Sequence, residues 1–242
     1  MKMLVFAKRC AKEIVRDPLN IAFGLGFPIV LLLLLSAIQA NIPVDMFRVE
    51  SLAPGIAVFG LSFMTLFSAT LLARDRESAF LQRLYTTPLR PSDFVLGYLL
   101  PIIPIAMAQS VICYLAAVFL GLPISVRVVY AVLLNLPMTL FYISLGILCG
   151  SVFNVKQVGG ICGALLTNVS AWLSGIWFDV EMIGRFGKVA QWLPFIHAVE
   201  LEKAVINGDF SAVLSHIGPV LIYAVAVTVA AIFLFLRQMK RQ

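Results

Sequence analysis

Six long stretches of the chain are apolar and contain no Asp, Glu, Lys or Arg, which leaves few residues for a water-soluble fold. Hydrophobic residues make up 61% of the chain and charged residues only 12%. Each stretch is close to the roughly 20 residues that a helix needs to cross a bilayer. In hydrocarbon every backbone donor must be paired within its own segment, so helices are expected. We predict an all-α polytopic membrane protein, a single domain over 1–242, with spans near 20–40, 53–73, 95–119, 128–152, 158–178 and 217–236.

The distribution of basic residues predicts the orientation of these spans. If the N-terminus is cytoplasmic, the outer segments hold only Arg48, Arg127, Arg185, Lys188 and Lys203. All other Lys and Arg then lie inside, as the positive-inside rule requires. We therefore predict a multi-pass protein of the cytoplasmic membrane with both termini in the cytoplasm. The net charge of +6 follows from this topology and does not indicate nucleic-acid binding.

Two other interpretations of the composition are weaker. Ile38-Gln39-Ala40 fits a signal-peptide cleavage site. However, the charged region before the first span is longer than the charged start of a signal peptide. The cysteines have neither a metal-binding spacing nor a disulfide framework, so we predict small apolar packing roles for Cys10, Cys113, Cys149 and Cys162.

Residues 1–18 have the pattern of an amphipathic helix on the membrane surface. Apolar residues recur at helical spacing from Met3 to Ile14, and Asp17-Pro18 ends the pattern. The polar face carries Lys8, Arg9, Lys12 and Arg16. Two interpretations remain open: an anchor to anionic lipid, or an interface helix that also touches a cytoplasmic partner.

The charged segment 74–91 separates the second and third spans. Phe80, Leu81, Leu84 and Tyr85 would form one apolar stripe on a short helix, with Arg76, Glu77 and Arg83 off it. We predict a short cytoplasmic helix parallel to the membrane, joined to both spans and suited to docking a partner.

Several motifs give this pattern a family resemblance. They are Leu-Ala-Pro-Gly-Ile from Leu52, the Arg76-Glu77 pair, Leu-Gln-Arg-Leu-Tyr-Thr-Thr-Pro-Leu-Arg-Pro from Leu81, Val-Leu-Gly-Tyr-Leu-Leu from Val95, and Leu-Pro-Phe-Ile-His-Ala-Val-Glu from Leu193. Together they resemble the ABC type-2 permease family, the membrane subunits of bacterial exporters for drugs, peptides, lipids and polysaccharides. The resemblance implies a coupling helix at 75–89 that contacts an ATPase through Arg76, Glu77, Gln82, Arg83, Leu84, Thr86, Thr87, Pro88 and Leu89. The family's Gly-Thr-Leu-Glu appears here as Ala79-Phe80-Leu81-Gln82, which changes the contacts expected of Gln82.

The same resemblance implies partners. The sequence contains no G-x-x-x-x-G-K-[ST] nucleotide-binding motif, so ATP and magnesium would be bound by a separate ATPase subunit, two per complex. A second permease subunit would complete the assembly. This chain would carry no cofactor and would not itself be an enzyme.

The connection 179–216 is expected to form a re-entrant hairpin of two short helices around Pro194. The resemblance places this element at an outer gate, with candidate gate residues Phe186, Leu193, Pro194, His197 and Leu201. Asp179, Glu181, Glu200 and Glu202 would make its surface acidic.

Two other function classes fit the sequence less well. A stand-alone channel or secondary carrier is disfavoured because no span contains an ionisable residue for ion coupling. An intramembrane hydrolase would depend on Ser174 and His197 alone, and a zinc site on His197, Glu200 and His216 has too few ligands. The glycine pairs 146/150 and 159/163 predict close helix contacts. A hydrophobic or amphipathic substrate fits best.

Overall fold

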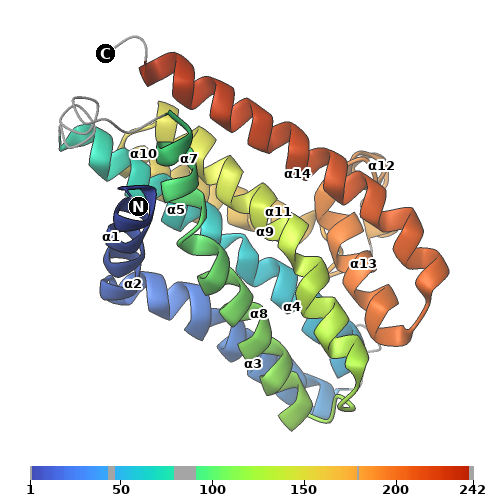
Figure 1. The fold of residues 1–242 in the computed structure, drawn as a ribbon. Helices are drawn as coiled ribbons and strands as arrows, with labels where there is room; N and C mark the ends of the chain where they lie inside the picture. Colours follow the sequence, from blue (N-terminus) through green and yellow to red (C-terminus); the bar gives the residue numbers. More distant parts are fainter. Residues whose placement is uncertain (1, 43–46, 79–90, 179, 240–242) are drawn as a thin grey trace.

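The computed structural model describes residues 2–42, 47–78, 91–178 and 180–239, and every regular element within these ranges is a helix. Figure 1 shows long helices that run side by side as one bundle. The short α1 (Lys2–Arg16) lies at one end of this bundle, and both chain termini are found at that end. The all-α prediction is confirmed for the described residues.

Five of the predicted spans correspond to helices that are long and apolar enough to cross a membrane. They are Ala22–Asn41, Val49–Glu77, Ser92–Phe119, Val126–Val152 and Phe210–Gln238. In element terms, α2 (Pro18–Ile21) leads into η1 (Ala22–Gly26) and α3 (Phe27–Asn41), followed by α4 (Val49–Leu61), α5 (Phe63–Glu77), α7 (Pro91–Leu99), α8 (Ile102–Phe119), α9 (Val126–Val152) and, last, α14 (Phe210–Met239).

The fifth predicted span, 158–178, does not meet the same criteria. The helical chain there consists of α10 (Val155–Val158), the π-helical η3 (Gly159–Leu166) and α11 (Thr167–Trp172). The helix ends at Trp172, and Gly175 adopts a positive φ of 74° that turns the backbone away. Apolar composition continued to residue 178, but helical structure did not. The count of six spans therefore stays a prediction.

The helix Val49–Glu77 forms the centre of the bundle. In its most apolar window 89% of the residues are buried, against 22% in the first and last spans. Its α5 half packs closely on α9, where a Cβ added to Gly146 would lie 1.9 Å from Ser68 Oγ and 2.4 Å from the Thr65 carbonyl oxygen. The predicted close contact at 146/150 is thus confirmed. Gly159, in contrast, has open space around it within the chain.

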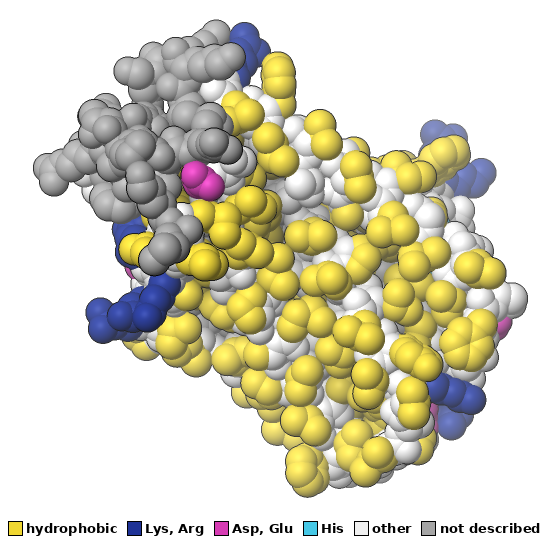
Figure 2. All heavy atoms as spheres, in the orientation of Figure 1, with side chains coloured by type: hydrophobic (Ala, Val, Ile, Leu, Met, Phe, Trp, Pro, Cys, Tyr) yellow, Lys and Arg dark blue, Asp and Glu magenta, His cyan; other side chains and the backbone are white. Residues whose placement is uncertain are grey.

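The outer surface of the bundle is largely apolar. Figure 2 shows hydrophobic side chains over most of the visible face and basic side chains near its ends. Helix α14 alone exposes Leu214, Ile222, Val225, Val229 and Phe233. Contiguous apolar surface of this extent is rare on soluble monomers, whereas it suits a surface in contact with lipid.

Three helical elements precede α14, and the last two of them lie on either side of the Leu193–Pro194 junction, where a hairpin was predicted; its re-entrant placement stays a prediction. The chain passes from η4 (Val180–Ile183) and α12 (Arg185–Ala190) into α13 (Pro194–Asn207). The predicted end of this connection at residue 216 is wrong, because Gly208 (φ 82°) ends α13 and α14 begins at Phe210.

Candidate coupling site at the N-terminal helix

Helix α1 is amphipathic as predicted, and its apolar face is packed against protein. Phe6, Cys10 and Ile14 are buried. The Phe6 ring meets the Tyr98 ring of α7 edge to face, with centroids 5.0 Å apart. Close approach requires Gly97, since a Cβ there would lie 2.2 Å from the Phe6 ring. The apolar stripe of α1 therefore holds the helix against the start of the third span.

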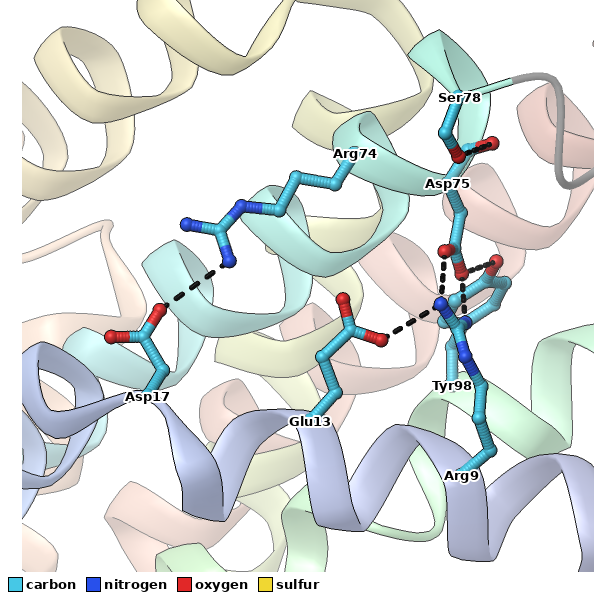
Figure 3. A network of polar contacts seen from close by, with 7 residues as sticks. All are labelled: Arg9, Glu13, Asp17, Arg74, Asp75, Ser78 and Tyr98. Carbon is cyan, nitrogen blue, oxygen red and sulfur yellow. Dashed lines mark hydrogen bonds and ion pairs between the residues drawn. The ribbon is translucent and has the colours of Figure 1, made fainter.

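A buried carboxylate joins α1 to the end of α5 (Figure 3). Arg9 donates two hydrogen bonds to Asp75, Nη1 to Oδ2 at 2.6 Å and Nη2 to Oδ1 at 2.7 Å. Tyr98 donates its hydroxyl to Asp75 Oδ2 at 2.7 Å. Asp75 thus links three elements that are far apart in sequence: α1, α5 and α7.

The surroundings of Asp75 explain why its charge is tolerated. Its side chain is 2% exposed, and a buried carboxylate is unfavourable unless it is paired and hydrogen-bonded. The bidentate guanidinium and the phenol satisfy that need. Burial also raises the pKa of the neighbouring Cys10 thiol on α1 to about 12, although the charge of Arg9 opposes this shift.

Further ion pairs on the exposed side of α1 are weaker. Arg9 Nη2 also lies 2.8 Å from Glu13 Oε2, one helical turn along α1. Arg74 approaches Asp17 at 3.4 Å, and the Arg74 side chain is 49% exposed. Exposed pairs of this kind contribute about 0–1 kcal/mol.

Arg76 and Glu77 lie on α5 and contact a different part of the chain. Arg76 Nη1 donates to the Gly150 carbonyl oxygen at 2.7 Å, near the end of α9. Glu77 Oε1 accepts from the Val155 backbone N–H at 2.9 Å, at the start of α10. The predicted coupling helix at 75–89 is therefore corrected at its beginning, because Asp75–Glu77 continue the second span.

The remaining predicted coupling residues lie outside the described residues: Gln82, Arg83, Leu84, Thr86, Thr87, Pro88 and Leu89. Their role in contacting an ATPase stays a prediction. The described chain reaches this segment through Ser78, directly after the contacts of Arg76 and Glu77, and resumes at α7. Both ends of the segment are thus attached to the Asp75 network.

A second buried carboxyl group, which was not predicted to be buried, lies at the opposite end of the bundle. Glu202 of α13 is 1% exposed and accepts a hydrogen bond of 2.5 Å from the Tyr114 hydroxyl of α8. Burial raises the pKa of Glu202 well above its ordinary value. The prediction that Glu202 contributes to an acidic surface is wrong, because α13 packs against α4, α9 and α14.

The candidate gate residues do not form one cluster within this chain. Leu201 and Pro194 are buried and Leu193 packs against the core, whereas Phe186 is 70% exposed. His197 Nδ1 lies 3.0 Å from His216 Nδ1, and its Nε2 donates to the Gln191 carbonyl oxygen at 2.9 Å. An outer gate at these residues stays a prediction.

The histidine contacts bear on the hydrolase and zinc alternatives. Ser174 donates to the Ala171 carbonyl oxygen at 2.8 Å, while both His197 nitrogens have other partners. No serine–histidine pair is formed by these two residues. Among the described residues, no three His, Cys, Asp or Glu side chains are placed to hold a metal ion.

A groove with aromatic walls opens on the side of the bundle. Its volume is about 420 Å³, and it lies between the first span, the Val49–Glu77 helix and the 155–177 region. The walls include Phe23, Phe27, Phe59, Phe63, Trp172 and Trp177, with Thr167 and Asn168 as polar residues. Several rings pack edge to face, for example Phe59 against Trp177 at 6.1 Å.

The sequence did not predict Asp75 and Tyr98 to lie together with Arg9. Asp75 appeared as one charge within the run Arg74-Asp75-Arg76-Glu77, and Tyr98 as one aromatic residue of an apolar span. A usable signal was present at Asp75, since a carboxylate on a helix that continues a membrane span needs a cationic partner. The identity of that partner depended on where α1 packs.

The fold and this site define a multi-pass, all-helical membrane protein with a polar network at the end that carries α1. Comparison with known families shows more: residues 1–205 match the profile of the ABC-2 type transporter family. The chain belongs to this family and is an ABC transporter permease subunit, a class that functions with an ABC ATPase. A search of curated proteins found no significant match.

Proposed function

We propose that this chain is the permease subunit of an ABC exporter that moves a hydrophobic or amphipathic substrate out across the bacterial cytoplasmic membrane. Two permease subunits would work with two ATPase subunits, which bind ATP and magnesium. The end of the bundle with α1 would be cytoplasmic, as the excess of basic residues there favours. The segment 155–172 would complete a set of six spans, and α12 and α13 would form the outer re-entrant element.

The Asp75 network is the observation that carries the coupling part of this proposal. Arg9 and Tyr98 tie α1 and α7 to α5, while Arg76 and Glu77 tie α5 to the α9–α10 connection. A force applied to the segment after Ser78 would therefore act on several helices at once. Packed helices transmit displacement with little compression, so this arrangement suits a mechanical input from an ATPase.

The aromatic groove supports the proposed substrate class. Ligand sites are mostly apolar concavities with a few polar groups that set orientation. Here the rings of Phe59, Phe63 and Trp177 supply apolar area, and Thr167 and Asn168 supply the polar groups. The groove is open in the single chain, so a second permease subunit could close it.

Reconstitution provides the test of this function. The permease, purified together with its ATPase, is placed in liposomes, and the uptake of amphipathic fluorescent compounds is measured with ATP or a non-hydrolysable analogue. We expect ATP-dependent transport that Phe59→Ala lowers. Phe233→Ala is the matched control, because Phe233 is 67% exposed on α14, away from the groove.

Two results would overturn the proposal. Transport or ion flux that needs no ATPase would indicate a stand-alone channel or carrier. Equal transport by the Phe59 and Phe233 variants would separate the groove from the substrate path.

A further inference from the structure

We propose that the exposed face of α1 is a binding site for the phosphate headgroup of an anionic lipid. A hollow of about 920 Å³ lies between α1 and Arg74 of α5. Its charged lining consists of five cations and two carboxylates: Lys8, Arg9, Lys12, Arg16 and Arg74, with Glu13 and Asp17. Figure 2 shows basic side chains gathered over this part of the molecule. We call this feature the basic hollow.

The two carboxylates of the basic hollow are already matched within the chain. Glu13 pairs with Arg9, and Asp17 pairs with Arg74. Lys8, Lys12 and Arg16 lie one turn apart on α1, and none of them forms an ion pair with another described residue. These three cations are therefore available for an external anion.

Apolar side chains on the same helix indicate that the anion belongs to a lipid. Leu4, Val5 and Val15 of α1 are 62%, 72% and 56% exposed, next to the three cations around the helix. A surface helix that alternates exposed apolar and long basic side chains suits the headgroup level, where Lys and Arg stems lie along acyl chains and their charges reach phosphate.

The neighbouring surface places α1 at the polar–apolar boundary. Past the end of α1, a crevice of about 270 Å³ opens between the first span and α8, lined by Ile14, Val15, Ile21, Leu25 and Ile105 among others. Arg16 and Asp17, next in sequence, line the basic hollow instead. The first span starts only a few residues later, at Ala22. Basic sites between helices at this depth are suited to anionic lipid headgroups.

A protein surface is the competing occupant, and the exposed apolar residues disfavour it. An acidic ATPase surface would match the charges, yet it would leave Val15 and the apolar crevice without a partner. A lipid satisfies both, with phosphate at the cations and acyl chain along the apolar side chains. This inference does not depend on transport activity, because its measurement is lipid binding.

The test uses the full-length protein in a neutral detergent. Native mass spectrometry measures the retention of phosphatidylglycerol against phosphatidylcholine for the wild type and Lys8→Gln/Lys12→Gln. The matched control is Lys156→Gln/Arg237→Gln, which removes the same charge from exposed residues outside the hollow. One basic residue near an anionic surface contributes about fivefold in affinity. We expect the first variant to bind phosphatidylglycerol about 30-fold more weakly and the control to bind it normally.

Four results would overturn the inference. Equal losses in the two variants would show a nonspecific charge effect. Phosphatidylcholine retained as well as phosphatidylglycerol would show that the phosphate charge is not recognised. Displacement of the lipid by millimolar inorganic phosphate, or unchanged lipid binding together with lost recovery of the ATPase, would assign the hollow to a soluble anion or to the protein partner.

Discussion

The contact between Arg9 and Asp75 should determine whether α1 stays attached to the bundle. Replacement of Arg9 by Gln leaves the Asp75 carboxylate buried with the Tyr98 hydroxyl as its remaining strong donor. We expect α1 to detach far more often in this variant. Buried Cys10 would then become accessible, so its reactivity reports detachment.

The magnitude follows from the burial of the two partners. Breaking a buried ion pair by removing one partner costs about 3–5 kcal/mol. Asp75 is 2% exposed but Arg9 is 36% exposed, so water can partly replace the lost guanidinium. We therefore expect about 3 kcal/mol, which corresponds to a roughly 150-fold increase in the open population at about 1.36 kcal/mol per tenfold.

The assay is the rate of maleimide labelling of Cys10 in a variant whose other three cysteines are replaced by Ala. In the attached helix, burial raises the pKa of Cys10 to about 12, so almost no thiolate is present at neutral pH. Detachment restores an ordinary pKa of about 8.5. The matched control is Arg74→Gln, which removes an exposed pair on the same helix as Asp75 and should change the rate at most about fivefold.

A double variant tests whether α1 detaches because a buried charge has lost its partner or because packing is lost in general. Arg9→Gln/Asp75→Asn leaves no buried charge without a partner, so it should label more slowly than Arg9→Gln alone. The proposed role of this ion pair is refuted if Arg9→Gln labels Cys10 no faster than Arg74→Gln does, or if the double variant labels faster than Arg9→Gln alone.

Three further predictions concern the rest of the bundle. Burial raises the pKa of Glu202, so the folded protein holds a proton that the unfolded chain releases, and stability should fall as the pH rises above the ordinary glutamate pKa. Glu202→Gln should remove that decline, seen as a higher Tm at pH 8. Desolvation, together with the charge of His216, lowers the pKa of His197 in the folded protein. As the pH drops, His197 therefore takes up a proton more readily in the unfolded chain than in the folded protein. The Tm should then fall below about pH 6.5, and it should fall less in His197→Gln. Gly146→Ala should cost about 3 kcal/mol or more, because its Cβ meets the Thr65 backbone, whereas Gly159→Ala has open space.

Each of these predictions has a clear contrary result. A Glu202→Gln variant with the same alkaline decline as the wild type would show that the decline does not come from a raised pKa of Glu202. Identical acid profiles for the wild type and His197→Gln would remove His197 as the group that titrates. Equal thermal shifts for the variants at Gly146 and Gly159 would contradict the close packing of α5 on α9.

The sequence alone was sufficient to identify the spans and the amphipathic N-terminal helix. Hydrocarbon admits only segments that pair their own backbone groups and carry apolar side chains, so length and hydropathy locate them directly. Five of the six predicted spans were confirmed on this basis. The exception, 158–178, is mostly apolar and contains no charged residue, but its helix ends at Trp172 because Leu173 and Gly175 leave the helical conformation. Composition does not record that turn.

Only the tertiary structure decided which polar residues meet. Arg9 and Asp75 are 66 positions apart, and Tyr114 and Glu202 are 88 apart. Nothing in the local sequence distinguishes Arg9 from Lys8 or Lys12. The packing of Phe6 against Gly97 and Tyr98 orients α1 so that Arg9 faces Asp75, whereas the two lysines stay exposed. Hydropathy depends on each residue separately, whereas partners depend on how helices pack, and that packing is determined by contacts between distant parts of the chain.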